Sequence, residues 1–463
     1  MALTVRSILI GVMLLATGAE AHAQLLGGQG LGGLRPGGLG GLPSVPVVTS
    51  PPTLPVIPTR NSLPSTAVAP PLSTLTPTAS VSIDNAANTL GQTVQGTTAG
   101  VARDLVGRPL TQAPLSRDDQ GHPIVPSEIL AVSPTPESLA AARRLNFNIV
   151  RQDRLGSLNL SVAILRAPDG VTESQALATL RQADPAGNYD YANIYNPSGG
   201  QAVSESNRPG LSPAQPAQPA LRIGMIDGGV EAHHSAFSGT RIVSRNFAGP
   251  GETLATAHGT AVASLLAGSD KDFSGYLSGA TLYAADVFGG QASGGSATEI
   301  AQALNWFAES GVPVVNISLA GPANALLEAA VKAFVATGHV LVAATGNDGP
   351  AAPPNYPAAY AGVIGVTASD ASRHFALDAN RNAARFTAIG IGIKAAALPG
   401  GYGPVSGTSY ASPLVAARFA FLVSAPGNDN CQAALNILTH AAIPVPNSAI
   451  GYLPPPTGQL AQR

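Results

Sequence analysis

The sequence predicts an α/β protein whose C-terminal half forms a parallel β-sheet covered by helices on both faces. Several nearly continuous apolar runs have the length of buried strands, and helical segments separate one run from the next. The chain also holds 52 Gly and 40 Pro with only 11% charged residues. This composition indicates a globular part rich in small residues, together with at least one segment that cannot fold.

The first 23 residues have the composition of a cleavable export signal. Arg6 supplies the positive charge, residues 8–16 form a short apolar run, and two Ala-x-Ala patterns end at Ala21 and Ala23. The run is too short to span a bilayer as a helix, and no later apolar stretch reaches about 18 uninterrupted residues. We therefore expect a secreted or periplasmic protein of bacterial type without stable membrane insertion; an uncleaved anchor is the alternative.

Residues 24–80 are rich in Gly, Pro, Ser and Thr and are predicted to be disordered, because they cannot bury enough apolar area to offset chain entropy. Residues 81–125 are less clear. Apolar residues over 84–107 have the spacing of one amphipathic helix, for which the sequence suggests no function.

A small α+β domain is predicted for residues 126–196, with order beginning near Pro126. The segments follow the order β-α-β-β-α-β, and Ser138 and Thr172 are expected to begin the two helices. This order is that of the ferredoxin-like motif. The expected strands are 128–132, 147–152, 158–165 and 189–195, and the expected helices begin at 139 and 172.

A Pro/Ala/Gln linker at 197–219 separates this small domain from the parallel-sheet domain at 220–456, and residues 457–463 form a tail. The linker is expected to be extended and accessible to proteases. The larger domain has predicted strands at 221–226, 280–287, 312–319, 340–344 and 363–368, and predicted helices at 261–266, 297–307 and 324–336. Ligands of such sheets bind outside the carboxyl ends of the strands, so polar residues there are the candidates for chemistry.

Charge and cysteine content exclude some function classes. The formal net charge is -2 and no run of Lys or Arg stands out, whereas a nucleic-acid surface needs a basic patch. The single cysteine, Cys431, excludes an intrachain disulfide and any metal site built from several cysteines. We interpret Cys431 as a small apolar filler.

Three polar residues stand at positions suited to nucleophilic catalysis. Asp227 ends the first strand of the larger domain and precedes two glycines, and His258 opens a helix of small residues that another segment can approach closely. Ser409 follows Gly407 at a helix N-terminus, where the helix dipole and a backbone N–H favour developing negative charge. Each residue alone has a simpler interpretation, as a turn aspartate, a structural histidine or an N-cap serine.

Taken together, the motifs resemble those of the subtilisin-like serine peptidases, or subtilases, over about residues 220–453. The most specific pieces are His258-Gly-Thr before a small-residue helix and the run Gly-Thr-Ser-x-Ala-x-Pro around Ser409. The chain order Asp, His, Ser agrees with that family. The resemblance implies a serine endopeptidase with the catalytic triad Asp227, His258 and Ser409, no metal in the chemistry, and Asn347 as a side-chain donor to the oxyanion.

The resemblance also implies a groove in which substrate adds as a strand to the edge of a sheet. The expected substrate-binding residues are Ser318, Leu319, Ala320 and Gly321 on one wall of the S1 pocket, Ala344 and Gly346 on the other, and Asn355 at its floor. Many relatives carry glycine at the floor, so Asn355 is expected to narrow the pocket. Small or medium uncharged side chains are therefore predicted at P1, the residue before the cleaved bond.

Several positions depart from the family pattern. Ala261 replaces a second histidine, Gly228 replaces a serine or threonine after the aspartate, and Tyr410 replaces a methionine that often follows the nucleophile. Residues 269–278 look too short for the family's strong calcium loop, and their two aspartates, Asp270 and Asp272, are interpreted as solvated. We expect no required cofactor; a structural calcium is possible, but the sequence does not support one.

The resemblance further implies that residues 126–196 are a propeptide, which acts as intramolecular inhibitor and folding assistant, and that the linker contains a self-processing site. Such a template is useful because a parallel sheet with many long-range contacts folds slowly. The expected partners are protein or peptide substrates and the chain's own propeptide, and the expected state is a monomer. Two alternatives stay open: a weak or inactive relative that binds peptides or proteins in the same groove, and a specialised processing enzyme for one partner.

Overall fold

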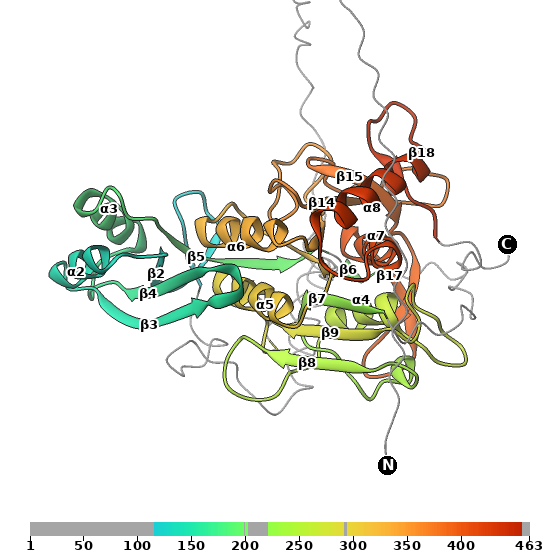
Figure 1. The fold of residues 1–463 in the computed structure, drawn as a ribbon, viewed down its shortest axis with the longest axis horizontal. Helices are drawn as coiled ribbons and strands as arrows, with labels where there is room; N and C mark the ends of the chain where they lie inside the picture. The colour runs from blue at the N-terminus through green and yellow to red at the C-terminus, as the bar shows by residue number, and fades with distance from the viewer. Residues whose placement is uncertain (1–114, 199, 202–220, 291–293, 456–463) are drawn as a thin grey trace, which may run out of the picture. The chain divides into compact units, whose positions relative to one another are not determined.

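The computed structural model describes residues 115–198, 200–201, 221–290 and 294–455 (Figure 1). The predicted signal, the Gly/Pro-rich segment, the helix considered over 84–107, most of the linker and the C-terminal tail lie outside the described residues. All described residues belong to one compact unit.

The N-terminal subdomain, residues 115–198, is built on four antiparallel strands with the spatial order β5-β2-β4-β3, which is the order of the predicted ferredoxin-like motif. Its elements are β2 (Pro123–Val132), α2 (Pro136–Arg144), β3 (Asn148–Leu155), η1 (Gly156–Leu158), β4 (Leu160–Arg166), α3 (Glu173–Ala183) and β5 (Tyr189–Pro197). Thr172 caps α3 as predicted, with a capping box to Gln175.

Two local predictions for this subdomain were wrong. Regular structure begins before Pro126, because β1 (Ser116–Arg117) pairs with the start of β2. The N-cap of α2 is Thr135 rather than Ser138, since the Thr135 hydroxyl accepts a hydrogen bond from the Ser138 N–H at 3.2 Å. Pro136 then occupies the first helical position, where the N–H it lacks would have no helical partner.

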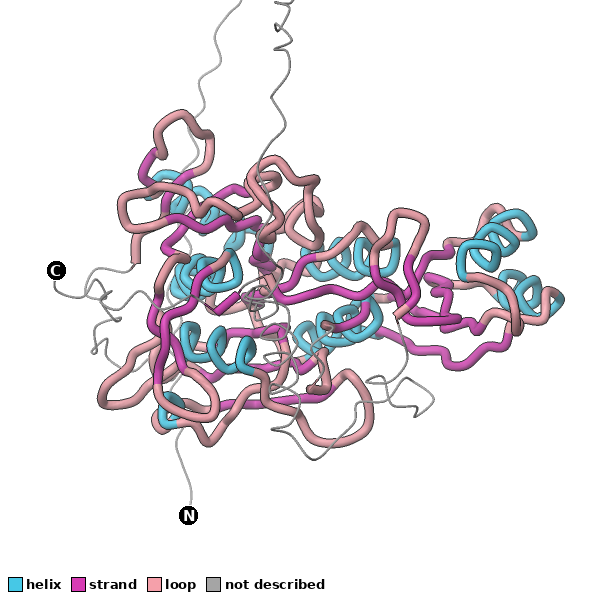
Figure 2. Tube along the Cα trace, turned by 180° about the vertical axis from the view of Figure 1, so that it is seen from behind, coloured by secondary structure: helices cyan, strands magenta, loops and turns pink. Residues whose placement is uncertain are grey.

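Both faces of the subdomain sheet are apolar. Ile129 and Ala131 pack in a core with residues of α2 and α3, whereas Leu130 and Val132 pack in a core that includes α5 (Ala297–Glu309) and α6 (Ala325–Ala336). This alternation follows from the two-residue period of a strand. The subdomain therefore shares a core with the C-terminal domain, and α5 and α6 lie between the two sheets (Figures 1 and 2).

The C-terminal domain is built on a nine-stranded sheet with the order β18-β19-β15-β14-β13-β11-β7-β9-β8, which confirms the predicted parallel α/β class. All neighbours are parallel except β18 and β19. The strands are β7 (Arg222–Asp227), β8 (Ile242–Asn246), β9 (Thr281–Asp286), β11 (Val314–Ile317), β13 (Val340–Ala344), β14 (Ile364–Ser369), β15 (Ala384–Ile389), β18 (Ile443–Pro444) and β19 (Gly451–Tyr452).

Helices cover both faces of this sheet. Met225 of β7 packs in a core with residues of α4 (Ala257–Ala267), α7 (Thr408–Leu422) and α8 (Asn428–Ala441), while Ile226 packs in the core that contains α5 and α6. Strand β7 lies between β9 and β11. The chain adds β8 and β9 on one side of β7 and then adds β11 and β13 on its other side. The carboxyl end of such a strand is the usual position of a binding site, and Asp227 lies there.

Short strands join the two parts of the chain. The end of β5 lies between β10 (Gly295–Ser296) and β12 (Leu319–Ala320) and is antiparallel to both. Just beyond it, β6 (Gly200–Gln201) pairs with the hairpin of β16 (Ile393–Ala396) and β17 (Tyr402–Ser406). Figure 1 shows β5 leaving the subdomain and running toward the centre of the larger domain.

Candidate active site

Asp227 and His258 form a buried acid–base pair at the carboxyl end of β7. His258 lies in the first turn of α4, and its Nδ1 is 2.9 Å from Asp227 Oδ1. The His258 side chain is 11% exposed, and the Asp227 side chain is fully buried. Gly259 allows this approach, because a Cβ at that position would overlap the backbone carbonyl of Gly228. The helix therefore begins where it can present an imidazole directly to the carboxylate.

One oxygen of the Asp227 carboxylate lacks a donor among the described residues. The Gly228 N–H donates to Oδ1 at 2.7 Å, while the buried Oδ2 has no hydrogen-bond partner there. Gly228 stands where the family usually has serine or threonine, and a Cβ there would overlap the Thr256 side chain. Thr256 itself is the N-cap of α4, and its hydroxyl oxygen accepts a hydrogen bond from the Gly259 N–H at 3.0 Å.

Ser409 is fully buried in the first turn of α7. Gly407 precedes the helix with φ of 136°, a backbone conformation that favours glycine. The Ser409 hydroxyl donates to the carbonyl of Ser318 at 3.1 Å. The buried Nε2 of His258 has no hydrogen-bond partner in the described part of the chain.

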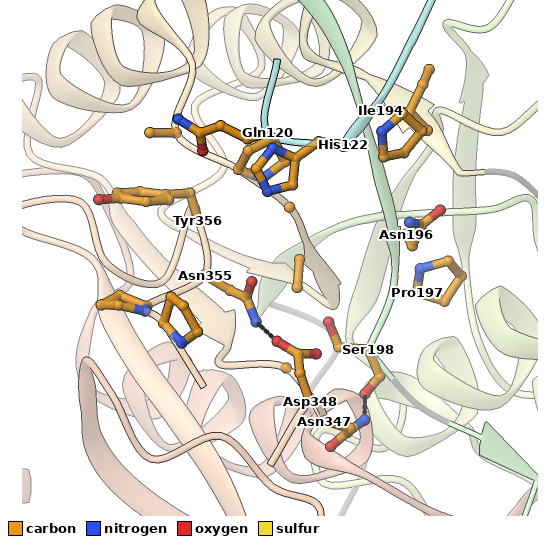
Figure 3. A pocket seen from close by; sticks show the side chains of 18 of the residues that line it. Gln120, His122, Ile194, Asn196, Pro197, Ser198, Asn347, Asp348, Asn355 and Tyr356 are labelled. Atoms are coloured by element: carbon orange, nitrogen blue, oxygen red, sulfur yellow. Dashed lines mark hydrogen bonds between the residues drawn. The ribbon is translucent and has the colours of Figure 1, made fainter. Parts of the chain in front are cut away.

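A backbone carbonyl of the N-terminal subdomain lies at the start of α7. The oxygen of Ser198 accepts hydrogen bonds from the Ser409 N–H at 3.0 Å and from Asn347 Nδ2 at 2.6 Å. Figure 3 shows the second of these contacts. Asn347 is held in turn by the Thr408 N–H, which donates to its Oδ1 at 3.1 Å. The two shorter contacts to the Ser198 oxygen come from a backbone N–H at a helix N-terminus and from a side-chain amide, the pairing expected of an oxyanion hole, and the Thr408 hydroxyl donates at 3.4 Å.

The residues before Ser198 are extended and pair with short strands on both of their edges. The Ser198 N–H donates to Ser318 O at 3.1 Å. Pro197 lies opposite Leu319 and Asn196 opposite Ala320 across the β5–β12 pairing. On its other edge, Tyr195 lies opposite Gly295. The structure therefore brings the predicted substrate strand against an extended segment of the same chain.

A cavity of about 820 Å³ lies next to Ser198, with walls from both parts of the chain (Figure 3). Of the predicted pocket residues, Ala320, Gly321, Gly346 and Asn355 line it. Ser318, Leu319 and Ala344 do not line it, and all three are fully buried. Asn355 Nδ2 donates to Asp348 Oδ2 at 2.6 Å and to Thr345 O at 3.1 Å, so its amide is fixed at the wall.

Tyr410 covers the imidazole. Its ring is 3% exposed, and the centroids of Tyr410 and His258 are 5.3 Å apart. Burial raises the pKa of the Tyr410 hydroxyl well above its usual value, so this side chain stays neutral. The sequence placed Tyr410 beside Ser409 but did not indicate its contact with His258.

Other histidines and an aspartate considered from the sequence make contacts that do not involve Asp227, His258 or Ser409. His234 caps η2 (Ser235–Phe237) and bonds Gly401 O at 2.9 Å, and His339 stacks on Phe334 with ring centroids 4.5 Å apart. Asp270 accepts a hydrogen bond from the Tyr402 hydroxyl. Over the described ranges, no three His, Cys, Asp or Glu side chains are grouped so as to hold a metal ion.

Three residues that contribute to the site were not identified from the sequence. Ser198 was assigned to the start of the linker, and Thr408, whose N–H positions Asn347, was treated only as part of a motif. Asp286 lies opposite Asp227 in the sheet and accepts the N–H groups of Leu254, Phe288 and Gly289. Burial raises the pKa of Asp286. Its position at a strand's carboxyl end was the one available signal.

Comparison with known proteins agrees with this geometry. Residues 219–452, about half of the chain, match the subtilase family. Subtilisin DY of Bacillus licheniformis is 34% identical over 227 residues, which cover 44% of this chain and 77% of the relative. Subtilisin Savinase of Lederbergia lenta is 34% identical over 219 residues, which cover 44% and 76%, respectively.

One solved structure extends the likeness of fold. Fervidolysin from Fervidobacterium pennivorans, described as a keratinolytic enzyme related to subtilisin, has a TM-score of 0.60 and 19% identity. The likeness covers 73% of this chain and 61% of that one. Since the family match spans only about half of the chain, the shared fold extends beyond it.

The chain belongs to the subtilase family. It is a serine endopeptidase, an enzyme that hydrolyses peptide bonds in proteins and peptides. None of the helices in the described residues is long and apolar enough to cross a membrane.

Proposed function

We propose that Asp227, His258 and Ser409 are the catalytic triad of a secreted endopeptidase that is made as a self-processing zymogen. The single observation that carries the proposal is the position of the Ser198 carbonyl. It is held by the Ser409 N–H and the Asn347 amide, as a substrate carbonyl would be before attack. A peptide segment of the chain itself thus occupies the groove in a substrate-like manner.

The proposed reaction uses each of these groups once. The Ser409 hydroxyl turns from the Ser318 carbonyl to His258 Nε2, gives up its proton there, and attacks the peptide carbonyl. Asp227 keeps Nδ1 protonated and stabilises the imidazolium that forms. The oxyanion is held by the Ser409 N–H and Asn347, the proton passes from His258 to the leaving amine, and water then hydrolyses the acyl-enzyme.

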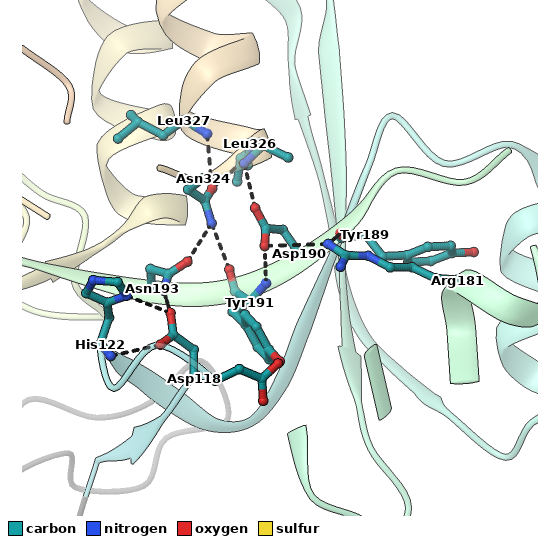
Figure 4. A network of polar contacts seen from close by, with 12 residues as sticks. Asp118, His122, Arg181, Tyr189, Asp190, Tyr191, Asn193, Asn324, Leu326 and Leu327 are labelled. Atoms are coloured by element: carbon teal, nitrogen blue, oxygen red, sulfur yellow. Dashed lines mark hydrogen bonds and ion pairs between the residues drawn. The ribbon is translucent and has the colours of Figure 1, made fainter. Parts of the chain in front are cut away.

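The N-terminal subdomain is proposed to be the inhibitor and folding template of this enzyme. A polar network supports a specific contact at the start of α6 (Figure 4). Asn324 Nδ2 donates to Tyr191 O at 2.8 Å and to Asn193 Oδ1 at 3.0 Å, and the Ala325 N–H donates to Asp190 Oδ2 at 2.7 Å. An acidic side chain at a helix N-terminus is favourable. Together with the shared apolar core, these bonds fix the subdomain beside the groove.

Residues 1–23 are proposed to direct export and to be removed. One relative, which is 32% identical over 219 residues, is named a minor extracellular protease of Bacillus subtilis. Mass measurement of the exported protein tests the proposal, which predicts that no product retains residues 1–23. The mature enzyme is proposed to be a monomer that needs no cofactor.

The S1 pocket is proposed to accept small or medium uncharged residues, because Asn355 is fixed within its wall. Ser198, whose carbonyl accepts from the Ser409 N–H, is the residue proposed to lie at P1, and it is itself small and uncharged. A peptide library varied at P1 measures the preference directly. Preference for large aromatic residues would contradict the role given to Asn355.

Comparison of the wild type with Ser409→Ala by gel and mass tests the zymogen proposal. We expect the wild type to divide into two fragments and Ser409→Ala to stay at the full length left after export. Cutting of both proteins alike would show that another protease does the processing. A wild type that stays uncut would contradict self-processing.

A further inference from the structure

We propose that the chain cuts itself at the peptide bond that follows Ser198, so that the inhibitory fragment ends at Ser198 and the mature enzyme begins at Gly199. The inference rests on the proposed self-processing and assigns its site. Sequence alone left the position open within the linker, and its Pro/Ala/Gln repeat at 213–219 was the part that looked most accessible.

The donors at the Ser198 carbonyl are the first argument. The Ser409 N–H and Asn347 Nδ2 lie 3.0 and 2.6 Å from its oxygen, and the Thr408 hydroxyl lies 3.4 Å away. Oxyanion-hole donors act at about 2.7–3.1 Å from the oxygen that becomes charged. The nucleophile belongs to the same residue as the first donor, so the carbonyl carbon of Ser198 is the carbon that Ser409 is placed to attack.

Strand register on the N-terminal side is the second argument. Ser198 N donates to Ser318 O, and the two residues before it pair in sequence with Leu319 and Ala320. Moving the chain by one residue would place the Pro197 carbonyl between the donors and reverse the side of every side chain in the strand. It would also place proline, which has no N–H, where Ser198 now donates.

Register on the C-terminal side is the third argument. Gly200 lies opposite Ser406 and Gln201 opposite Val405 in an antiparallel pairing with β17. Ser406 stands only three residues before Ser409. Strand pairing thus holds the chain on both sides of the bond. In the sequence, only residue 199 stands between Ser198 and the pairing that begins at Gly200.

The self-cleavage reaction needs no reactant other than water. Ser409 Oγ forms an ester with the Ser198 carbonyl carbon as the amide bond to Gly199 breaks, and His258 passes the serine proton to the amine of Gly199. Water then releases Ser198 as a carboxylate and restores Ser409. The strand pairings of β5 do not depend on the broken bond, so we expect the fragment to remain bound after the cut.

The experiment is mass measurement of both new ends in the exported full-length protein, sampled from the first minutes after export. We expect the smaller fragment to end at Ser198 and the larger to begin at Gly199. Because the first minutes precede most later trimming, the earliest carboxyl end of the smaller fragment decides the site. A carboxyl end elsewhere, including within 213–219, would overturn the assignment.

Two matched proline variants sharpen the test. Ser198→Pro removes the N–H that donates to Ser318 O, so we expect cutting after residue 198 to slow at least tenfold. Gln215→Pro places the same residue type in the repeat and should leave the site and rate unchanged. Slowing by Gln215→Pro alone would place the cut in the repeat and overturn the proposal.

Failure of the inference is distinguishable from failure of the zymogen proposal. If the wild type but not Ser409→Ala is cut, and the smaller fragment ends elsewhere, self-processing stands and only the bond is wrong. If both proteins are cut or neither is, self-processing fails and the assignment fails with it.

Discussion

At the scale of single residues, the site depends on groups whose positions are fixed by backbone contacts. Asn347 is the clearest case, because one end of its amide accepts from Thr408 N and the other donates to the Ser198 carbonyl. The bond from Thr408 N does not involve the segment in the site, so it orients the amide independently of that segment. Such preorganised donors contribute to catalysis because they need not reorganise as charge develops.

Asn347→Ala is expected to lower kcat by about 10²–10³-fold with little change in KM, because the lost bond strengthens as the oxyanion forms. Steady-state kinetics on a peptide substrate measure both constants. Asn436→Ala, in the exposed part of α8, is the matched control and should match the wild type. A loss confined to KM would contradict the role of Asn347 at the oxyanion.

Tyr410 is expected to make the enzyme resistant to peroxide. A methionine beside the nucleophile carries a thioether that peroxide converts to a polar sulfoxide, whereas tyrosine has no such group. The one methionine of the described residues, Met225, is fully buried. Activity after exposure to dilute peroxide is the measurement: the wild type should keep its activity and Tyr410→Met should lose most of it. Equal, rapid loss in both proteins would contradict this explanation.

At the scale of elements, the sequence predicted the strands that are buried on both faces. Strands β7, β9, β11, β13 and β14 were each anticipated, because their apolar runs are nearly continuous. Strands β8 and β15 were not, since Arg245 and Arg385 interrupt their runs and their exposure is mixed. Strand β18, at the edge of the sheet, and its neighbour β19 hold two residues each, too few for any periodicity.

The candidate site, like the set of strands, was predictable from the sequence only in part. Asp227, His258, Ser409 and Asn347 were named because each stands in a local motif beside a strand end or helix start. Ser198 was not, because its role depends on strand pairing with segments more than 100 residues away in the sequence. Contacts of that kind leave no local pattern.

The contact of α4 with the loop after β7 should be intolerant of added bulk. Gly259→Ala is expected to destabilise the protein by about 1–3 kcal/mol, because its Cβ overlaps the Gly228 carbonyl. Gly156→Ala is the control, since nothing lies within 4 Å of its added Cβ. Thermal unfolding of both variants in the Ser409→Ala background avoids self-digestion. Equal midpoints would contradict the packing described here.

The start of α6 should control release of the inhibitory subdomain. Asp190→Ala removes the acceptor of the Ala325 N–H, a type of bond worth about 1.5–3 kcal/mol. Burial raises the pKa of Asp190, so part of that gain is offset by desolvation. We expect roughly tenfold weaker retention of the fragment.

The time at which activity appears after processing measures this retention. Asp190→Ala should become active earlier than the wild type, and Asp169→Asn, at an exposed site of the same subdomain, should not. No change in Asp190→Ala would show that the shared apolar core alone holds the fragment.

At the scale of the whole molecule, the N-terminal subdomain, which we propose to be the inhibitor, shares an apolar core with the larger domain. The subdomain sheet and the main sheet pack on opposite sides of the same helices, and β5 continues into the groove. A parallel sheet with many long-range contacts folds slowly, so a preformed surface for α5 and α6 lowers the cost of bringing distant segments together. If the subdomain is released after cutting, as proposed, we expect slow unfolding to keep the enzyme folded.

The central claim is that Ser409 is the nucleophile of an active peptidase. Labelling of the activated, exported enzyme with a serine-directed phosphonate, followed by peptide mapping, tests it most directly. We expect one label per molecule, on the peptide that contains Ser409, together with complete loss of peptide hydrolysis, and no label on Ser409→Ala. A label on another serine, or hydrolysis that persists in the fully labelled protein, would contradict the account.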